Sequence, residues 1–160
     1  MDDLFQATIE EKFKVLTSSV DELRSFLPKQ RQEYAEDTKT QAAVERVCQK
    51  IIECTIDTNS EVLRRIDKSR APRGRAGFQR MLELGIVGGK TYRRFAEEPN
   101  AYLRFRNLIV HVYDKIDAVA AYYTAQRLIP DAMQYGKEIR QYLDSLEIED
   151  VDESGEQSPS

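Results

Sequence analysis

Hydrophobic residues recur every three or four positions along nearly the whole chain, which is the spacing of one face of an α-helix. The first apolar stripe predicts a helix over residues 4–26, closed by Pro28. A second stripe, from Ala43 to Ile66, predicts a longer helix over residues 32–66. The sequence has no alternating β-branched run joined by Asn-Gly or Asp-Gly turns, so it predicts no sheet.

The second half of the chain is predicted to be helical in shorter pieces. After a basic loop at 69–75, the pattern indicates a short helix over 78–84 that ends at Gly85, and another helical turn near Lys90. A further helix is expected from Ala101 through Tyr113, and a last one capped by Asp117, bent at Pro130 and ending near Leu146. We therefore predict an all-α, up-and-down helical bundle over residues 1–146 and a disordered acidic tail over 147–160.

Composition narrows the class of protein. The 160 residues are 41% hydrophobic and 32% charged, which favours one globular domain over a disordered, collagenous or membrane protein. No apolar run approaches the length needed to span a bilayer and the first residues are acidic, so we expect a cytoplasmic protein. Cys48 and Cys54 have no second cysteine pair or histidine beside them, so we expect two free thiols and no metal site.

Charge is distributed unevenly along the chain. Seven acidic residues and no lysine or arginine occur from Asp144 onward, whereas the segment 64–106 holds twelve basic residues against four acidic ones. Such a segment can attract a polyanion, although basic side chains on helix faces are also common for solubility alone. The arginines of residues 69–80 have three open interpretations: they hold RNA beside a cleavage site, they dock an acidic partner, or they form an inert loop.

The only histidine, His111, lies in the most informative segment. If residues 101–113 are helical, an apolar arc faces the core, made of Phe105, Leu108, Ile109, Val112, Ile116 and Val119. His111 then points away from the core on the same side as Asn107, while Arg106 and Tyr113 share a stripe at the edge of the arc. The segment therefore presents a base, a permanent cation, an amide and a phenol on a polar face.

This set of side chains suits a phosphodiester. Arg106 can hold a phosphate through a bidentate fork, and His111 can move the proton of an attacking hydroxyl or of a leaving oxygen. RNA cleavage by the 2′-hydroxyl needs both a base and an acid, and a chain with one histidine meets this need most simply as a homodimer.

The residues Arg106-Asn107, Val110-His111 and Tyr113 fit the R-N-x-x-V-H-x-Y pattern, and here the chain resembles the HepT toxins of the HEPN superfamily. The resemblance covers nearly all of residues 32–146. Other positions that match the family are Tyr34, Asp37, residues 42–46, residues 78–87, Phe105 and Ile116-Asp117.

The resemblance implies a dimeric helical bundle and a metal-independent endoribonuclease, without a cofactor, in a toxin–antitoxin module of the type II or VII kind. Arg106 and His111 would be catalytic, and Asn107 would support them. The partner it implies is a nucleotidyltransferase antitoxin of the MntA type, which silences the toxin by transferring AMP to the motif tyrosine, here Tyr113. Two alternatives stay open: a non-catalytic HEPN module that binds a nucleotidyltransferase, and a plain helical scaffold.

Overall fold

The computed structural model describes residues 2–68, 71–111 and 116–156, with side chains described through residue 152. Three long helices form the frame: α1 (Asp3–Phe26), α3 (Thr38–Ile66) and α7 (Ala118–Glu156). The shorter elements are α2 (Arg31–Glu36), α4 (Gly74–Glu83), α5 (Gly89–Tyr92), the π-helical turn η1 (Arg93–Glu97) and α6 (Tyr102–Val110).

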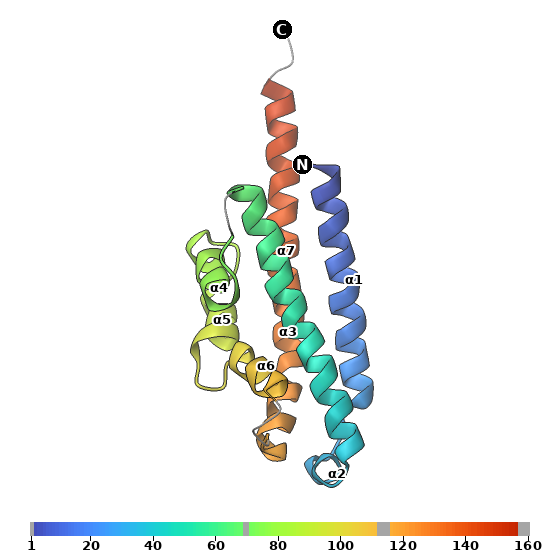
Figure 1. Cartoon of the computed structure of the whole chain (residues 1–160). Coiled ribbons are helices and arrows are strands. Elements are labelled where there is room, and N and C mark those ends of the chain that lie inside the picture. Colours follow the sequence, from blue (N-terminus) through green and yellow to red (C-terminus); the bar gives the residue numbers. More distant parts are fainter. Residues whose placement is uncertain (1, 69–70, 112–115, 157–160) are drawn as a thin grey trace.

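The bundle has four segments, or legs, that alternate in direction: α1, α3, the run from α4 to α6, and α7 (Figure 1). The helix α1 runs antiparallel to α3, the segments α4 to α6 carry the chain back along α3, and α7 then runs beside α1 and α3. The predicted all-α, up-and-down bundle is therefore confirmed over the described residues, with a third leg that is broken into short helices.

A cluster of aromatic rings ties this broken leg to the frame. The ring of Phe95 in η1 lies 5.1 Å from that of Phe78 in α4 and 4.8 Å from that of Tyr102 in α6, measured between ring centroids. Both Phe78 and Phe95 also pack on Tyr135 of α7, at 5.9 and 5.8 Å. Since all four side chains are almost completely buried, their packing fixes α6 against the bundle.

The helix predicted over residues 32–66 is divided at Asp37 into α2 and α3, which corrects the sequence interpretation. Asp37 has an extended backbone, and its carboxylate accepts hydrogen bonds from the backbone N–H groups of Lys39 and Thr40 and from the Thr40 hydroxyl. These hydrogen bonds lower the pKa of Asp37. An N-cap residue must leave the helical conformation to do this, so the helix is interrupted at Asp37, ahead of the apolar stripe that begins at Ala43.

The end of α4 follows the prediction. Gly85 adopts φ +73°, its N–H donates to the Leu82 carbonyl, and the N–H of Ile86 donates to the Met81 carbonyl. This is the Schellman arrangement, which needs a left-handed residue after the last helical turn and therefore favours glycine.

Two predicted boundaries near the C-terminal half differ from the structure. The helix α6 ends at Val110 instead of Tyr113, in a run of β-branched and aromatic residues that lose side-chain freedom in a helix. The helix α7 continues to Glu156 instead of ending near Leu146, so residues 147–156 are helical where we expected a disordered tail. Extending an existing helix adds one hydrogen bond for each residue fixed, which explains why it continues past its last buried residue, Leu146.

Candidate functional site

Arg106 lies on the side of α6 that faces α3. Its Nη2 atom is 3.4 Å from Oε1 of Glu53, and its Nη1 donates a hydrogen bond of 3.3 Å to Oδ1 of the neighbouring Asn107. About a third of the side chain is exposed (34%), and its buried Nε–H has no hydrogen-bond partner among the described residues. The guanidinium is thus held from two sides while donors remain for a ligand. The structure places the side chains of Arg106 and Asn107 in contact.

Glu53 is a residue that the sequence interpretation missed. Its Oε1 atom accepts one hydrogen bond from Arg106 and another, of 3.1 Å, from Gln49 one turn earlier on α3. The contact joins residues 53 positions apart in the sequence. Nothing in the local pattern around Glu53 distinguishes it from other glutamates on a solvated helix face.

His111 is the residue that ends α6. Its backbone N–H donates to the Asn107 carbonyl at 3.0 Å, but its own backbone is extended, so it lies just outside the helix. The side chain is exposed, as the sequence predicted, and no hydrogen bond or ion pair with another described residue holds the ring. The imidazole is therefore accessible for proton transfer, and none of the described residues fixes its orientation.

The apolar arc expected to face the core is only partly buried. Phe105 is buried, but Leu108 and Val119 are each 39% exposed. Val110, next to His111, is 41% exposed. The prediction that the whole arc faces the core is therefore wrong for Leu108 and Val119. Tyr113 and its neighbour Val112 lie outside the described residues.

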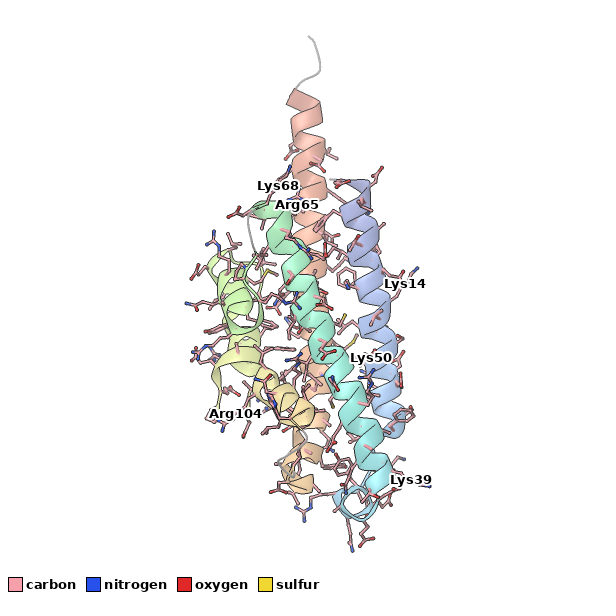
Figure 2. All side chains as sticks on the ribbon, in the orientation of Figure 1. Lys14, Lys39, Lys50, Arg65, Lys68 and Arg104 are labelled. Carbon is pink, nitrogen blue, oxygen red and sulfur yellow. The ribbon has the colours of Figure 1, made fainter. Side chains whose placement is uncertain are left out.

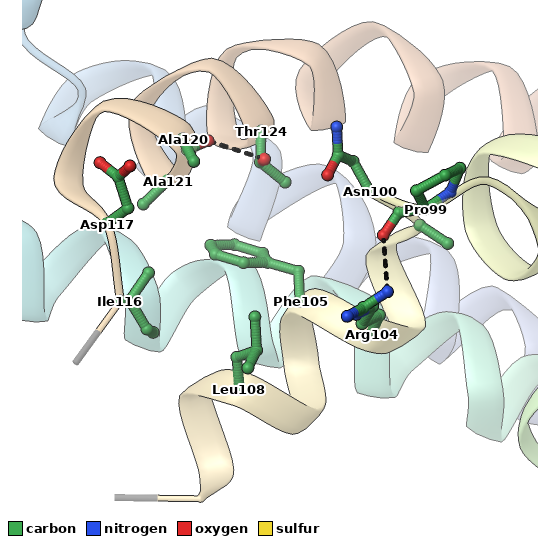
Figure 3. A pocket seen from close by; sticks show the side chains of 11 residues that line it. Pro99, Asn100, Arg104, Phe105, Leu108, Ile116, Asp117, Ala120, Ala121 and Thr124 are labelled. Carbon is green, nitrogen blue, oxygen red and sulfur yellow. Dashed lines mark hydrogen bonds between the residues drawn. The ribbon is translucent and has the colours of Figure 1, made fainter. Parts of the chain in front are cut away.

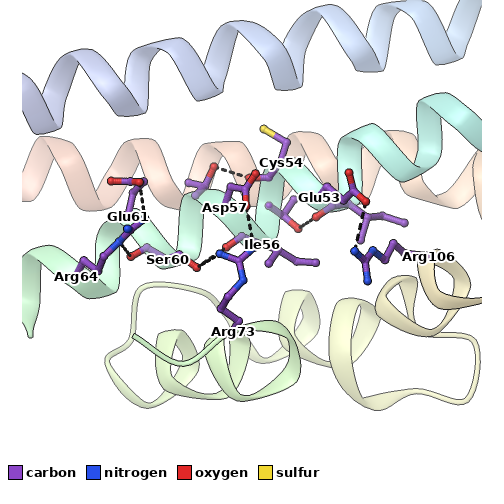
Figure 4. A network of polar contacts seen from close by, with 12 residues as sticks. Glu53, Cys54, Ile56, Asp57, Ser60, Glu61, Arg64, Arg73 and Arg106 are labelled. Carbon is purple, nitrogen blue, oxygen red and sulfur yellow. Dashed lines mark hydrogen bonds and ion pairs between the residues drawn. The ribbon is translucent and has the colours of Figure 1, made fainter. Parts of the chain in front are cut away.

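A polar hollow of about 610 Å³ opens beside Arg106 (Figure 4). Its walls come from the middle of α3, the start of α4 and the side of α6 that faces α3. The lining residues are Glu53, Ile56, Asp57, Arg73, Gly74 and Arg106. A space of this size with two guanidinium groups can accept a phosphorylated ligand.

A second hollow of about 410 Å³ lies between α6 and the start of α7 (Figure 3). Phe105 and Leu108 from α6 and Ile116 before α7 give it an apolar wall, and Arg104 lies at its edge with Nη1 3.4 Å from the Pro99 carbonyl. This hollow offers apolar contact area beside the end of α6. Its lining includes none of the site residues predicted from the sequence.

The basic segment 64–106 is less positive in space than it is in sequence. Many of its arginines contact carboxylates, as in the ion pairs Arg64–Glu61, Arg73–Asp57, Arg80–Glu83 and Arg94–Glu98. The basic side chains of the whole molecule are also spread over several helices, with Lys14 on α1, Lys50 on α3 and Arg104 on α6 (Figure 2). Any attraction for a polyanion must therefore come from a few well-placed arginines.

The two cysteines are buried and unpaired, as predicted. Burial raises the pKa of the Cys48 thiol to about 12 and also raises the pKa of Cys54. A thiol that stays protonated at neutral pH is a poor nucleophile and a poor metal ligand, so neither cysteine contributes to the site.

The fold and the motif on α6 together define the class. The profile of the family described as Ribonuclease HepT-like matches residues 16–139, and the chain belongs to this family. The match confirms the resemblance inferred from the R-N-x-x-V-H-x-Y residues.

Two individual proteins show how far the similarity extends. The chain is 26% identical over 152 residues to the tRNA nuclease HepT of Aphanizomenon flos-aquae (strain 2012/KM1/D3), covering 93% of this chain and 99% of that protein. Its fold is similar to that of a tri-AMPylated HEPN toxin from Shewanella oneidensis in complex with MNT antitoxin, with a TM-score of 0.72 and 15% identity, covering 88% of this chain and 99% of that one. Within the described ranges, no helix is both long and apolar enough to pass through a membrane.

Proposed function

We propose that this protein is a metal-independent endoribonuclease toxin of a cytoplasmic toxin–antitoxin module. The observation that carries the proposal is Arg106, whose guanidinium is held between Glu53 and Asn107 and lines an open polar hollow, five residues before the exposed His111. Membership of the Ribonuclease HepT-like family supports the same activity. Because a relative that aligns along nearly its whole length is a tRNA nuclease, tRNA is the first substrate to test.

The reaction we propose is attack of a ribose 2′-hydroxyl on the adjacent phosphorus. A histidine takes the proton of the 2′-hydroxyl, the bond from O2′ to phosphorus forms, and the bond from phosphorus to O5′ breaks. A second histidine, now as an acid, protonates the leaving O5′. The products are a 2′,3′-cyclic phosphate and a 5′-hydroxyl. Arg106 stabilises the negative charge on the phosphoryl oxygens, and Asn107 keeps its guanidinium in place.

This chemistry favours a homodimer. One chain has a single histidine, so two copies are needed to supply both a base and an acid at one phosphate. The exposed apolar side chains Leu108 and Val110 flank the end of α6 at His111, and their burial against a second copy would bring the two imidazoles to one cleft.

For regulation we propose that an MNT-type nucleotidyltransferase antitoxin transfers AMP to Tyr113. The supporting observation is the similarity in fold to the Shewanella oneidensis toxin, which is tri-AMPylated and in complex with its MNT antitoxin. Nucleotides attached seven residues from Arg106 would place phosphate charge where the RNA phosphate has to bind.

The test is an incubation of tRNA and mRNA with the purified, unmodified protein in excess EDTA, followed by identification of the fragment ends. We expect cleavage that leaves 2′,3′-cyclic phosphate, and a loss of rate by a factor of about 10²–10⁴ in His111→Ala, the usual contribution of a general acid or base. Arg106→Lys keeps the charge but loses the bidentate fork, so we expect it to be much slower than the wild type as well.

A matched control is Arg80→Lys, since Arg80 is an ion-paired arginine on α4 outside the hollow. No cleavage by folded protein whose Tyr113 is shown by mass spectrometry to be unmodified would refute the nuclease proposal for these RNAs. It would favour a HEPN module that binds the nucleotidyltransferase without cutting RNA.

A further inference from the structure

The polar hollow beside Arg106 contains a second arginine that comes from a different element. Arg73 precedes α4 and reaches toward α3, where its Nη2 lies 2.9 Å from Oδ1 of Asp57 and its Nη1 donates to the Ser60 hydroxyl at 3.0 Å. Figure 4 shows Arg73 and Arg106 on the same side of α3, with Ile56 between them. The two guanidinium groups therefore border one space.

The position of Arg73 is set by its backbone. Gly74 has φ +60°, a conformation that L side chains rarely adopt, and this sharp turn starts α4 directly after Arg73. Gly77 then packs so closely on Pro72 that an added Cβ would lie 2.9 Å from the Pro72 carbonyl oxygen. The turn and the close packing hold Pro72 against α4, and the contacts with Asp57 and Ser60 direct the Arg73 side chain to α3, so Arg73 is oriented before any ligand arrives.

Carboxylates one helical turn apart hold the two arginines. Glu53 pairs with Arg106 and Asp57 pairs with Arg73, and four residues of helix correspond to a rise of about 6 Å. Each arginine therefore has its own anchor on α3, with the anchors displaced along the helix axis. Two cations displaced in this way suit two separate charges on one extended ligand better than a single small anion.

The ion pair between Arg73 and Asp57 is weak enough for a ligand to replace it. The Arg73 side chain is 60% exposed and its Asp57 partner 46%, and ion pairs this exposed contribute only about 0–1 kcal/mol. The hydrogen bonds described above use two of the five N–H donors of the Arg73 guanidinium. A phosphate can therefore bind the remaining donors without breaking a strong interaction in the protein.

We propose that Arg73 binds a phosphate of the RNA strand next to the phosphate held by Arg106, so that the hollow is the strand-binding groove of the nuclease. This inference rests on the proposed function. A strand that presents one phosphate to Arg106 has to continue into neighbouring space, and the hollow is the space that Arg106 itself lines. Ile56 forms an apolar floor between the two cations, which suits the sugar that joins two phosphates.

The experiment measures RNA binding separately from cleavage. Full-length His111→Ala protein is titrated with tRNA, and with a single-stranded oligonucleotide carrying 2′-methoxy groups, over a series of salt concentrations. In this background Arg73→Gln should reduce the slope of log K against log salt by about 0.7, which is the loss of one single-strand phosphate contact. The same slope change means binding about fivefold weaker at 0.1 M salt relative to 1 M. Arg73→Lys should keep most of the slope.

Asp57→Asn distinguishes a phosphate contact from a structural tether. If Arg73 binds phosphate, removing its carboxylate partner frees a cation, and Asp57→Asn should bind RNA more tightly while Arg73→Gln binds more weakly. If the ion pair only fastens α4 to α3, both variants lose the same contact and shift in the same direction, which would overturn the proposal. Arg80→Gln is the matched control, because Arg80 is half exposed and ion-paired on α4 but does not line the hollow.

Three further results separate this inference from the proposed function. Equal RNA binding and equal cleavage by Arg73→Gln and wild type would refute the role of Arg73 while leaving the nuclease intact. Normal RNA binding together with lost binding of the nucleotidyltransferase would refute it too, and would assign the hollow to the protein partner. If Arg73→Gln binds RNA more weakly than the wild type, but the wild-type protein never cleaves RNA, the result would support the groove and refute the nuclease. Circular dichroism of each variant checks that the fold is intact.

Discussion

The buried contact between Tyr135 on α7 and Asn59 on α3 gives a sharp test of how the frame is held together. The Tyr135 hydroxyl donates to Oδ1 of Asn59 at 2.6 Å and lies 3.1 Å from the Thr55 carbonyl oxygen. Both side chains are almost fully buried, and burial raises the pKa of Tyr135 well above 10, so the hydroxyl remains a donor at every practical pH. In the part of the chain that the structure describes, Nδ2 of Asn59 has no hydrogen-bond partner.

Tyr135→Phe removes the donor and leaves Oδ1 of Asn59 buried without a partner. An unsatisfied buried polar group costs about 1–3 kcal/mol of unfolding free energy. For a chain of this length, each kcal/mol lowers Tm by about 2–4 °C. Asn59→Leu should cost less than Tyr135→Phe, since it also removes the unpartnered Nδ2 and the hydroxyl can still donate to the Thr55 carbonyl.

The assay is thermal unfolding followed by circular dichroism, at one fixed protein concentration because a dimer's stability depends on it. The double variant Asn59→Leu with Tyr135→Phe should be more stable than Tyr135→Phe alone, since it removes both polar groups. A coupling energy near zero, or a Tyr135→Phe protein within about 0.5 kcal/mol of wild type, would refute the reasoning.

Three other predictions follow from single contacts. Glu53→Gln should keep the fold but slow RNA cleavage about fivefold, equivalent to about 1 kcal/mol, because the arginine it holds loses an exposed ion pair; unchanged kcat would show that Glu53 does not position it. A thiol reagent at about pH 8 should modify Cys48 only when the protein unfolds, which mass spectrometry detects, because burial raises its pKa to about 12. Arg140 donates two hydrogen bonds to Glu10 and lowers the pKa of its carboxyl group. The pair therefore stabilises the fold above the usual carboxyl pKa, and this stabilisation is lost as pH falls through the lowered value. Between about pH 5 and pH 3, Glu10→Gln should lose less stability than the wild type in denaturant titrations.

The parts of the fold that could be predicted are those with local signals. The apolar stripe and Pro28 place the first helix within one residue of its observed start, and Gly85 marks the end of α4 through its left-handed conformation. Asp117 accepts a hydrogen bond from the Val119 N–H at the start of α7, as its position before an apolar run suggests.

The parts that the sequence did not reveal depend on contacts between distant residues or on competition between neighbours. Asp37 divides the predicted helix over residues 32–66 because its carboxylate caps α3, and the apolar stripe, which begins at Ala43, does not mark this boundary. Arg106 was identified from its motif, but Glu53, which holds it, lies on another helix and has no distinguishing neighbours. The same applies to Asn59 and Tyr135, whose side chains meet only after α3 and α7 pack.

The net charge of −4 overstates the negative charge near the proposed site, because seven acidic residues lie from Asp144 onward, past the part of α7 that packs beside the hollow. The helix α7 starts beside α6 and carries its acidic stretch from Asp144 toward the opposite end of the molecule (Figure 1). Tyr135 of α7 contacts Asn59 of α3 beside the hollow, and Asp144 lies nine residues further along α7, a rise of about 14 Å, which exceeds the Debye length of about 8 Å at physiological salt. RNA near Arg106 therefore experiences mainly the local balance of two arginines against two carboxylates, and the guanidinium donors that these carboxylates leave free can bind phosphate.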